Sequence, residues 1–333
     1  MSGEAPAQKA TMKAIVYDRY GSPDVLDLRE LDLPVVTDGG VLVRIHAASV
    51  NPLDWYSMTG TPYVARMGAG LRRPKSERLG VDFAGTVEAV GRDVTRFQPG
   101  DEVFGGSSGA FAEYVCARAD RMVLKPANLT FEQAAAVPVA GLTALQGLRD
   151  KGHIQPGHKV LINGASGGVG TFAVQIAKSF GAEVTGVCST RNVDMVRSLG
   201  ADQVIDYTQE DFTRSQRRYD LMLDIAGSRS WSECKRVLGS HATVVIVGGP
   251  KTNRLLGPIS HVVGMRLASL RASQKVTFFI SQMSQADLAV LHDLLEAGTV
   301  TPVVERSHQL SETPEALRYL GEGHAQGKLV ISV

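Results

Sequence analysis

Cysteine and aromatic residues are scarce in this sequence. Of its 333 residues, 3 are cysteine and 6% are aromatic. The cysteines, Cys116, Cys188 and Cys234, are odd in number and far apart, which argues against a disulfide framework and against a clustered cysteine metal site. We therefore expect the protein to occupy a reducing compartment, and we predict a cytoplasmic location.

An excess of one charge and long hydrophobic runs are also missing. The 35 Lys and Arg residues nearly balance the 34 Asp and Glu residues, for a net charge of +1, so no basic surface for nucleic acid is indicated. No apolar run approaches the roughly 20 residues of a membrane-spanning helix. The first residues, MSGEAPAQKA, lack the apolar segment of a signal peptide and resemble a flexible tail. We expect neither a nucleic-acid partner nor a membrane partner.

One stretch, residues 159–191, carries the clearest pattern in the chain. The apolar run Val160–Ile162 suits a buried strand, and Asn163–Gly170 is a glycine-rich turn. Apolar residues then recur at helical spacing up to Gly181, which suits a left-handed helix cap, and Glu183–Val187 suits a second strand. Strand, turn, helix and strand within about 30 residues predict a βαβ unit.

The glycine-rich turn favours dinucleotide binding. It aligns with the G-x-G-x-x-G fingerprint as Ala165-x-Gly167-x-x-Gly170, with alanine in place of the first glycine. Glycines allow a pyrophosphate to approach the backbone, and the following helix offers free N–H groups and the positive end of its dipole. A purely structural turn without a ligand is the alternative interpretation.

The residues after the second strand bear on which nucleotide binds. NAD sites usually place an acidic residue about 20 residues after the glycines, where it holds the ribose 2′-hydroxyl. Here the chain reads Cys188-Ser189-Thr190-Arg191, and hydroxyls with a guanidinium suit a 2′-phosphate. We therefore predict NADPH as the cofactor. The alternative is that Ser189 caps the next helix and Arg191 is solvated.

The pattern along the chain predicts an α/β protein with two kinds of domain. Short alternating strands with turn signals fill residues 12–117, which favours a compact β-rich domain or barrel. After Pro126 helices and strands alternate, as in a doubly wound parallel sheet. Thr130–Gln133 resembles a capping box, whereas Pro138–Gly141 is expected to interrupt the helices. The last strand, Lys328–Val333, is expected to rejoin the first domain.

Five motifs follow one another along nearly the whole chain: Ser49–Asp54, Gly80–Gly85, Gly141–Ala144, Asn163–Gly170 and Gly321–Lys328. Together they resemble the medium-chain dehydrogenase/reductase superfamily and, within it, the zinc-independent quinone oxidoreductase, or zeta-crystallin-like, group. The resemblance implies a GroES-like β-rich catalytic domain from residues 1–127 and 284–333. It also implies a Rossmann NADP-binding domain from residues 128–283, with the cofactor in the cleft between the two domains.

The resemblance also bears on metal binding. The zinc alcohol dehydrogenases of the superfamily place a Cys where this chain has Asn51, and a Gly-His-Glu where it has Gly80-Val81-Asp82. Their third ligand is missing too, because Val137–Leu142 contains neither Cys nor His. Without thiolate or imidazole ligands, we expect no metal at the site.

The activity implied by the resemblance is NADPH-dependent reduction of quinones or α,β-unsaturated carbonyl compounds, by direct hydride transfer without zinc. Such acceptors are already electrophilic, so hydrogen-bond donors can stabilise the oxyanion that forms. Asn51 is the implied substrate-positioning residue, and Tyr56 is a donor or proton source. Tyr63 shares the loop, and Thr143 is an implied nicotinamide contact. Asn51 could instead serve turn chemistry, Tyr56 could be a core aromatic, and Thr143 could merely pack.

The remaining cofactor contacts come from the fingerprint, from strand ends and from the last motif. Tyr207 is as consistent with packing as with a contact to the adenosine phosphate. Lys328 could pair with a phosphate or be solvated at the surface. Phe278 and Phe279 belong to the strand whose end approaches the nicotinamide. The full set is Ala165, Ser166, Gly167, Gly168, Val169, Ser189, Thr190, Arg191, Tyr207, Ala226, Gly248, Gly249, Phe278, Phe279 and Lys328.

Two alternative functions remain open, and the resemblance also implies an oligomeric state. The enzyme could instead reduce the carbon–carbon double bond of a specific enone metabolite or polyketide, with loop 57–79 setting the substrate. The chain could also be a non-catalytic NADPH-binding protein. A homodimer is implied, with the strand Lys275–Ile280 as the edge that pairs across subunits.

Overall fold

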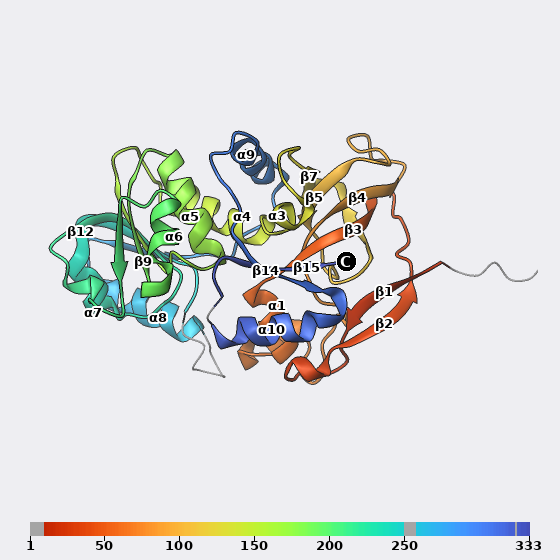
Figure 1. Ribbon diagram of the computed structural model, residues 1–333. Coiled ribbons are helices and arrows are strands. Elements are labelled where there is room, and N and C mark those ends of the chain that lie inside the picture. Colours follow the sequence, from red (N-terminus) through yellow and green to blue (C-terminus); the bar gives the residue numbers. More distant parts are fainter. Residues whose placement is uncertain (1–9, 250–257, 324) are drawn as a thin grey trace, which may run out of the picture.

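The computed structural model describes residues 10–249, 258–323 and 325–333 of the chain. The expected N-terminal tail therefore lies almost wholly outside the described residues, as does His324 of the last motif. In the described part, two bodies lie side by side, one around a parallel sheet and one around a mostly antiparallel sheet (Figure 1). The predicted α/β class with two kinds of domain is confirmed.

The first body, which we call the parallel-sheet domain, contains six parallel strands among the described residues. Their order is β10-β9-β8-β11-β12-β13, so the order reverses between β8 and β11. In such sheets, ligands bind beyond the carboxyl ends of the strands at this switch point. The predicted doubly wound sheet is confirmed. The strands are β8 (Lys159–Asn163), β9 (Glu183–Cys188), β10 (Gln203–Asp206), β11 (Tyr219–Asp224), β12 (Leu238–Ile246) and β13 (Lys275–Phe278).

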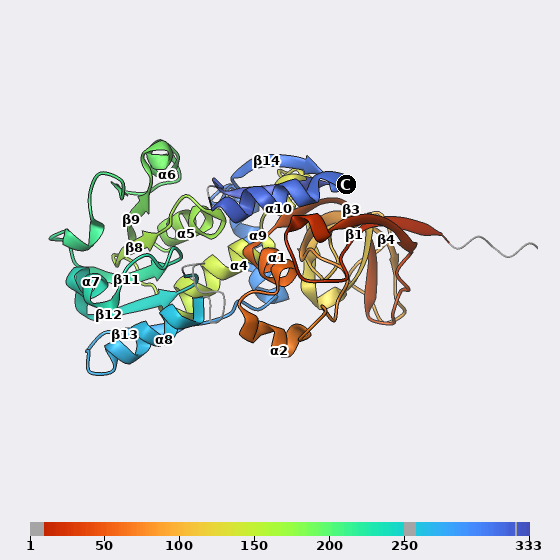
Figure 2. The same cartoon turned by 90° about the horizontal axis from the view of Figure 1, so that it is seen from below.

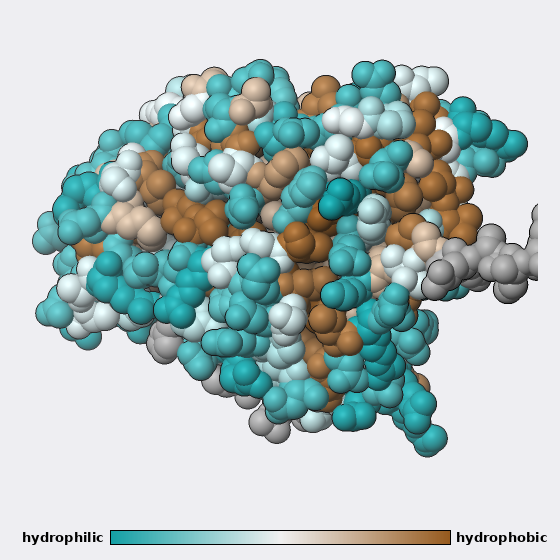
Figure 3. Space-filling view, turned by 45° about the vertical axis from the view of Figure 1, so that its right-hand side comes forward, coloured by the Kyte–Doolittle hydropathy of each residue, from teal (hydrophilic) through white to brown (hydrophobic). Residues whose placement is uncertain are grey.

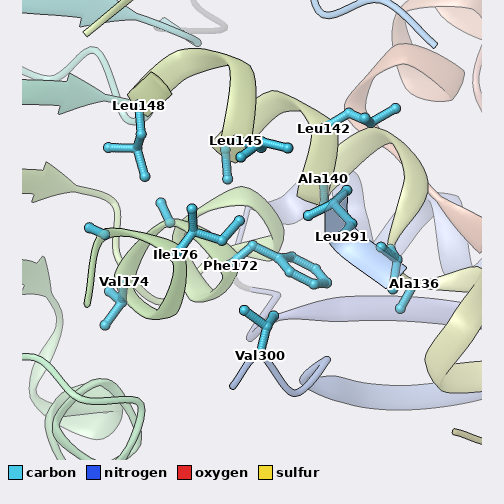
Figure 4. Close-up of a cluster of buried hydrophobic side chains, with 14 of the residues drawn as sticks. Ala136, Ala140, Leu142, Leu145, Leu148, Phe172, Val174, Ile176, Leu291 and Val300 are labelled. Atoms are coloured by element: carbon cyan, nitrogen blue, oxygen red, sulfur yellow. The ribbon is translucent and has the colours of Figure 1, made fainter. Parts of the chain in front are cut away.

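Helices of the parallel-sheet domain bury an extensive apolar surface. The face predicted for α5 (Gly168–Ser179) is buried, since Phe172 and Ile176 have no exposed surface. Figure 4 shows these two side chains close to Leu145 of α4 (Pro138–Gln146). The same apolar cluster continues to Phe104 in the other domain, so the two domains share one core. The other helices here are α6 (Val193–Ser198), α7 (Trp231–Cys234) and α8 (Pro258–Ser269).

The second body, the antiparallel-sheet domain, combines a seven-stranded sheet with a separate pair of strands. The path through the sheet is β14-β15-β3-β4-β5-β7, and β6 pairs with β3. β15 runs antiparallel to β3, so the C-terminal strand rejoins the first domain as predicted. The strands are β1 (Thr11–Val16) and β2 (Asp27–Asp32) in the pair, and β3 (Gly40–Val50), β4 (Asp82–Val90), β5 (Glu102–Gly106), β6 (Tyr114–Arg118), β7 (Met122–Leu124), β14 (Val304–Gln309) and β15 (Lys328–Ser332) in the sheet.

Helices from both domains meet between the two sheets. α1 (Pro52–Thr59) packs against α10 (Thr313–Glu322), and Figure 2 shows both near α4 in the middle of the molecule. α3 (Phe131–Ala135) packs against β3 and β4 of the antiparallel sheet. α9 (Gln285–Glu296) packs against both β7 and α4. The division of the chain after residues 127 and 283 stays a prediction.

The helical stretch around Pro138 differs from the prediction. The sequence predicts an interruption at Pro138–Gly141, but α4 begins at Pro138. Proline is well tolerated in the first turn of a helix, because the N–H that it lacks would have no partner there. The capping box before α3 is confirmed: Thr130 N donates to Gln133 Oε1 at 3.0 Å, and Gln133 N donates to Thr130 Oγ1 at 3.2 Å.

Apolar side chains also reach the surface. On the face drawn in Figure 3, they lie in patches among polar side chains. Leu267 and Leu270 in and after α8, and Ile280 after β13, are among the exposed large apolar residues. Across the described ranges, no helix is both long enough and apolar enough to span a membrane.

Candidate cofactor cleft and active site

The glycine-rich turn has the close packing that its sequence predicts. Gly164 adopts a φ of +97°, in the left-handed region that favours glycine. A Cβ on Gly170 would lie 2.1 Å from the Gly164 carbonyl oxygen, so the first turn of α5 requires glycine there. β9 accommodates the alanine at the first position, since a Cβ added to Gly186 would lie 3.0 Å from the Cβ of Ala165. The neighbouring strand thus supplies a glycine where the fingerprint lacks one.

A cavity of about 200 Å³ separates this turn from the antiparallel-sheet domain. Gly167, Gly168 and Val169 line one side, and Asn51 and Lys328 line the other. The structure therefore brings together five of the predicted site residues, from three distant parts of the chain. We call this cavity the cleft.

The chain before β15 joins the two walls of the cleft. Gly327 N donates to the Ser166 carbonyl oxygen at 2.8 Å. Asn192 Nδ2 donates to Ser166 Oγ at 3.0 Å and lies 3.2 Å from Ser189 Oγ, while Asn192 Oδ1 accepts from Gln326 Nε2. Asn192 therefore links the glycine turn, the end of β9 and the last motif. Sequence reasoning missed this residue, because no local pattern marks a buried amide that bonds to two distant segments.

A second cavity, of about 490 Å³, lies at the end of β9. It gathers the residues predicted to recognise the nucleotide, together with Gly323 and Ala325 from the other domain. Tyr207 is 56% exposed, which disfavours the alternative of a packing role. A neighbouring cavity of about 370 Å³ adds Gly164 and Ala226. The predicted residues that line the second cavity are Ser166, Ser189, Thr190, Arg191 and Tyr207.

An acidic residue that the sequence argument did not consider lies near this second cavity. Thr190 Oγ1 donates to Asp206 Oδ2 at 2.5 Å, and Thr208 Oγ1 donates to Asp206 Oδ1 at 2.7 Å. The hydrogen bond from Thr190 is the main reason that the pKa of Asp206 falls below its ordinary value. The acid comes from the end of β10, not β9, and its carboxylate is held by two hydroxyls. Thr190 thus uses its only O–H within the protein.

Asn51 stands at the centre of a buried polar network. Its backbone N–H donates to Asp54 Oδ2 at 2.8 Å, which caps α1, so the turn role weighed for this residue is present. Its side-chain Nδ2 lies 2.9 Å from Asp82 Oδ2 and 3.3 Å from the Ser49 carbonyl oxygen. Lys328 Nζ donates to Asn51 Oδ1 at 2.6 Å. Every polar atom of the Asn51 side chain therefore has a protein partner.

Three ionisable groups are buried around Asn51. Asp82, which is fully buried, accepts from Ser49 Oγ at 2.9 Å and from Val139 N at 3.1 Å. Burial raises the pKa of Asp82, and it raises the pKa of Asp54 to about 7. Burial lowers the pKa of Lys328, whose side chain is 3% exposed. This burial rules out the alternative of a solvated surface lysine at position 328.

The other three candidates for catalysis occupy different environments. Tyr56 is half-buried in α1, and burial raises the pKa of its hydroxyl, so it stays protonated at neutral pH. Thr143 Oγ1 donates to the Val139 carbonyl oxygen at 2.6 Å and lies 2.8 Å from Ser281 Oγ, which favours the packing alternative. Tyr63 lines a separate cavity of about 510 Å³, with its ring 4.6 Å from the Arg66 guanidinium. Tyr63 does not line the cleft.

The predicted residues at the last strand ends differ in their surroundings. A Cβ on Gly248 would lie 2.2 Å from the Ile225 carbonyl oxygen, so glycine permits this close approach. Gly249 is the last residue described before the gap at 250–257. The sequence predicts Phe278 and Phe279 in one strand, but β13 ends at Phe278. Phe278 is partly exposed, whereas Phe279 packs against the shared apolar core.

No group of three His, Cys, Asp or Glu side chains in the described residues could hold a metal ion. Asn51 stands where the zinc alcohol dehydrogenases have their first zinc ligand, a cysteine. Its side-chain amide is hydrogen-bonded to Asp82 and Lys328. An amide held in this way is a poor ligand for zinc, which prefers thiolate, imidazole and carboxylate donors.

Comparisons with known proteins agree with this architecture. A model of the alcohol dehydrogenase GroES-like domain matches residues 37–127, and a zinc-binding dehydrogenase model matches residues 199–331. The mitochondrial NAD(P)H oxidoreductase RTN4IP1 of Mus musculus is 35% identical over 98% of this chain and 90% of its own length. The 2-methylene-furan-3-one reductase of Solanum lycopersicum is 34% identical over 96% of this chain and 79% of its own length.

Solved structures give the same result. A quinone oxidoreductase from Coxiella burnetii has a TM-score of 0.85 and 33% identity, covering 97% of this chain and 100% of its own. A quinone oxidoreductase from Escherichia coli, complexed with NADPH, has a TM-score of 0.82 and 26% identity over the same shares.

Fold and cleft together define a two-domain oxidoreductase that uses a nicotinamide cofactor, with a GroES-like domain beside a Rossmann domain. The glycine turn, the strand order and the cleft residues all belong to this class. The chain is a member of the medium-chain dehydrogenase/reductase superfamily, within the group of quinone oxidoreductases.

Proposed function

We propose that this protein is an NADPH-dependent reductase of quinones or α,β-unsaturated carbonyl compounds that transfers hydride directly, without zinc. The observation that carries the cofactor choice is the second cavity, where Ser189 and Arg191 meet and the nearby Asp206 is held by Thr190 and Thr208. A guanidinium beside hydroxyls suits a 2′-phosphate, and the Asp206 carboxylate is held on the end of β10 by the two threonine hydroxyls. The NADPH complex of the Escherichia coli relative supports the same choice.

The cofactor assignment is tested by Arg191→Ala. The substitution removes a charge-assisted interaction with the 2′-phosphate, so the Kd of NADPH should rise about tenfold or more, while that of NADH stays within about twofold. Fluorescence titration measures both constants. Arg197→Ala is a matched control, since Arg197 is an exposed arginine of the adjacent α6 that pairs with Asp194. Equal losses for NADPH and NADH would contradict the assignment.

The zinc-free chemistry rests on the acceptor, on Asn51 in the wall of the cleft, and on Tyr56 in the helix that follows Asn51. NADPH supplies a hydride from its nicotinamide ring, and the acceptor carbonyl or quinone develops negative charge on oxygen. Asn51 lines the wall of the cleft, where its amide is available to position a bound ligand. Tyr56, which stays protonated, is the candidate donor to the oxyanion.

The reaction itself is tested by stopped-flow measurement of NADPH absorbance against quinones and enones. We expect single-turnover oxidation with at least one acceptor of either class. Reduction confined to enone double bonds would favour the second candidate, a carbon–carbon reductase for one metabolite, which the tomato relative's name supports. Tight NADPH binding with no oxidation by any acceptor would instead leave a non-catalytic binding protein.

Assembly and location complete the proposal. A homodimer formed along β13 is supported by the exposed apolar Ile280 beside that strand. A cytoplasmic location is supported by Cys116, Cys188 and Cys234, which are all free thiols. The mouse relative is mitochondrial, so the thiols argue for a reducing compartment more strongly than for the cytoplasm itself.

A further inference from the structure

Lys328 brings a buried positive charge to the wall of the cleft. It begins β15, and its side chain is 3% exposed. Its aliphatic stem passes the first turn of α5, since a Cβ on Gly168 would lie 2.9 Å from Lys328 Cδ. The lysine thus reaches from the glycine turn of one domain to the polar network of the other.

The ammonium group of Lys328 has protein oxygens as its neighbours. Nζ lies 2.6 Å from Asn51 Oδ1, 3.1 Å from the Val50 carbonyl oxygen and 3.6 Å from Asp82 Oδ2. Two of the three N–H donors of the ammonium are therefore used in hydrogen bonds, and the Asp82 carboxylate is its ion-pair partner at a longer distance. These contacts hold the ammonium against Asn51 and Asp82, which favours a role within this network over the phosphate contact that the sequence suggests for Lys328.

The same contacts fix the orientation of the Asn51 amide. Its NH₂ group faces the Asp82 carboxylate, at 2.9 Å, and the Ser49 carbonyl oxygen, at 3.3 Å. Its oxygen faces the ammonium of Lys328. A flip of the amide would place NH₂ against a cation and oxygen against an anion. The cation and the anion therefore select one orientation, in which both N–H groups are used and the oxygen keeps one lone pair.

We infer that Lys328 is a positioning residue for hydride transfer: paired with Asp82, it locks Asn51 as a hydrogen-bond acceptor toward the nicotinamide–ribose half of the cofactor. The ligand groups that suit such an acceptor are the ribose hydroxyls and the carboxamide N–H. Asn51 would then orient the hydride donor and not the substrate oxyanion. This inference rests on the proposed function, because it assigns roles within the same cleft.

The test compares Lys328→Met with the charge-matched double variant Lys328→Met/Asp82→Asn. The single variant leaves a buried carboxylate unpaired, whereas the double variant removes both charges and keeps similar volumes. Lys125→Met is the control for loss of a buried lysine away from the cleft, since Lys125 pairs with Glu102 at 3.0 Å and its side chain is 5% exposed. Three quantities are measured: kcat, the Kd of NADPH, and the emission spectrum of bound NADPH.

For the double variant we expect kcat to fall at least about tenfold while the Kd of NADPH changes less than about threefold, because no phosphate contact is lost. The emission of bound NADPH should shift, since the nicotinamide loses its fixed neighbour. Lys125→Met should leave kcat and the emission unchanged. Arg191→Ala should show a different pattern, in which the main change is a weaker Kd of NADPH.

Two results would overturn the inference. A tenfold weaker Kd with unchanged kcat would make Lys328 a phosphate ligand. A double variant with wild-type kcat and emission would make the ion pair purely structural. If the wild type oxidises no NADPH, the proposed function fails, and the emission of bound NADPH still decides the role of Lys328: an unchanged spectrum in the double variant refutes it.

Discussion

At the scale of single residues, Asp54 shows how burial changes an ordinary side chain. It caps α1 through the Asn51 backbone N–H, and its carboxyl is almost fully buried. Burial raises its pKa to about 7, more than the hydrogen bond from Asn51 lowers it. In the unfolded chain this pKa is about 3.9. The folded protein therefore binds this proton more tightly, and the stability that the proton contributes is lost as the pH rises through this window.

We expect Asp54→Asn to become more stabilising, relative to the wild type, as the pH rises from 5 to 8. The amide keeps an acceptor oxygen for Asn51 N but never has to ionise in the core. The difference in Tm at pH 8 should be about 2 °C or more. Thermal melts of both proteins across this pH range measure it.

Asp120→Asn is the control for that experiment, because Asp120 is an exposed acid that pairs with Arg118. Its pKa lies below its ordinary value, so it is ionised in both states between pH 5 and 8. Its effect on Tm should stay flat across this range. A flat difference for Asp54→Asn as well would mean that the buried carboxyl is ionised throughout.

At the scale of elements, the glycine turn needs space at two places, and a glycine provides it at each. Gly170 gives α5 room to begin against the carbonyl of Gly164, and Gly186 on β9 gives room to the methyl group of Ala165. The first requirement can be read from the fingerprint. The second depends on how β8 and β9 pair, so a sequence motif alone makes Ala165 look like a defect when the structure has compensated for it.

We expect Gly170→Ala to lower stability by roughly 1–3 kcal/mol, because its Cβ would meet a backbone oxygen that cannot move without moving the turn. It should also weaken NADPH binding at least about tenfold, since the turn must cradle the pyrophosphate. Gly264→Ala in α8 is the matched control: a Cβ there meets nothing within 4 Å, so it should stabilise by about 0.5–1 kcal/mol. Chemical unfolding and NADPH titration measure these effects. Unchanged NADPH affinity in Gly170→Ala would contradict the role of the turn.

The start of α4 also depends on tertiary packing. Proline before a run of small residues suggests a break, yet Pro138 occupies the first turn and α4 continues from it. Whether a helix ends before a proline or begins at it depends on whether the residues before or after the proline are buried against other elements. Here Leu142 and Leu145 are buried in the core that α4 shares with α5, and this burial favours the helix after the proline.

At the scale of the whole molecule, one apolar core joins the two domains, and the cleft lies beside it. Phe104 of the antiparallel sheet and Phe172 of α5 belong to the same buried cluster. Hydrogen bonds from Gly327 and Gln326 add a second connection across the cleft. Apolar packing and polar contacts therefore both fix the position of one wall of the cofactor site relative to the other.

We expect the protein to form a homodimer in solution along β13. Among the described strands, β13 pairs with β12 on one side and has no partner on the other. Ile280, just beyond it, is 80% exposed. Ile280→Asp should therefore convert the dimer to a monomer in sedimentation velocity experiments, because it places a charge in an apolar contact. Val35→Asp, at an 83% exposed site in the other domain, should leave the dimer intact. A wild-type monomer would refute the assembly.

Several site residues could be predicted because their signal is local. The strand, glycine turn and helix around Gly167, and the hydroxyls and guanidinium at Ser189 and Arg191, follow from spacing in one stretch. Asn192 and Asp206 could not be found in this way. Their roles depend on partners from other segments, Gln326 for the first and Thr190 for the second.

By itself, the sequence determined the class of fold and the cofactor family, since these depend on periodicity, turn chemistry and residue type along short stretches. Only the tertiary structure decided which groups Asn51 and Lys328 contact. Burial removes both from water, so each must find protein partners, and those partners, Asp82 and Val50, are set by how β15, β3 and β4 meet. The tertiary fold thus joins a motif asparagine and a lysine, for which the sequence left a phosphate contact and a surface position open, in one buried polar network at the cleft.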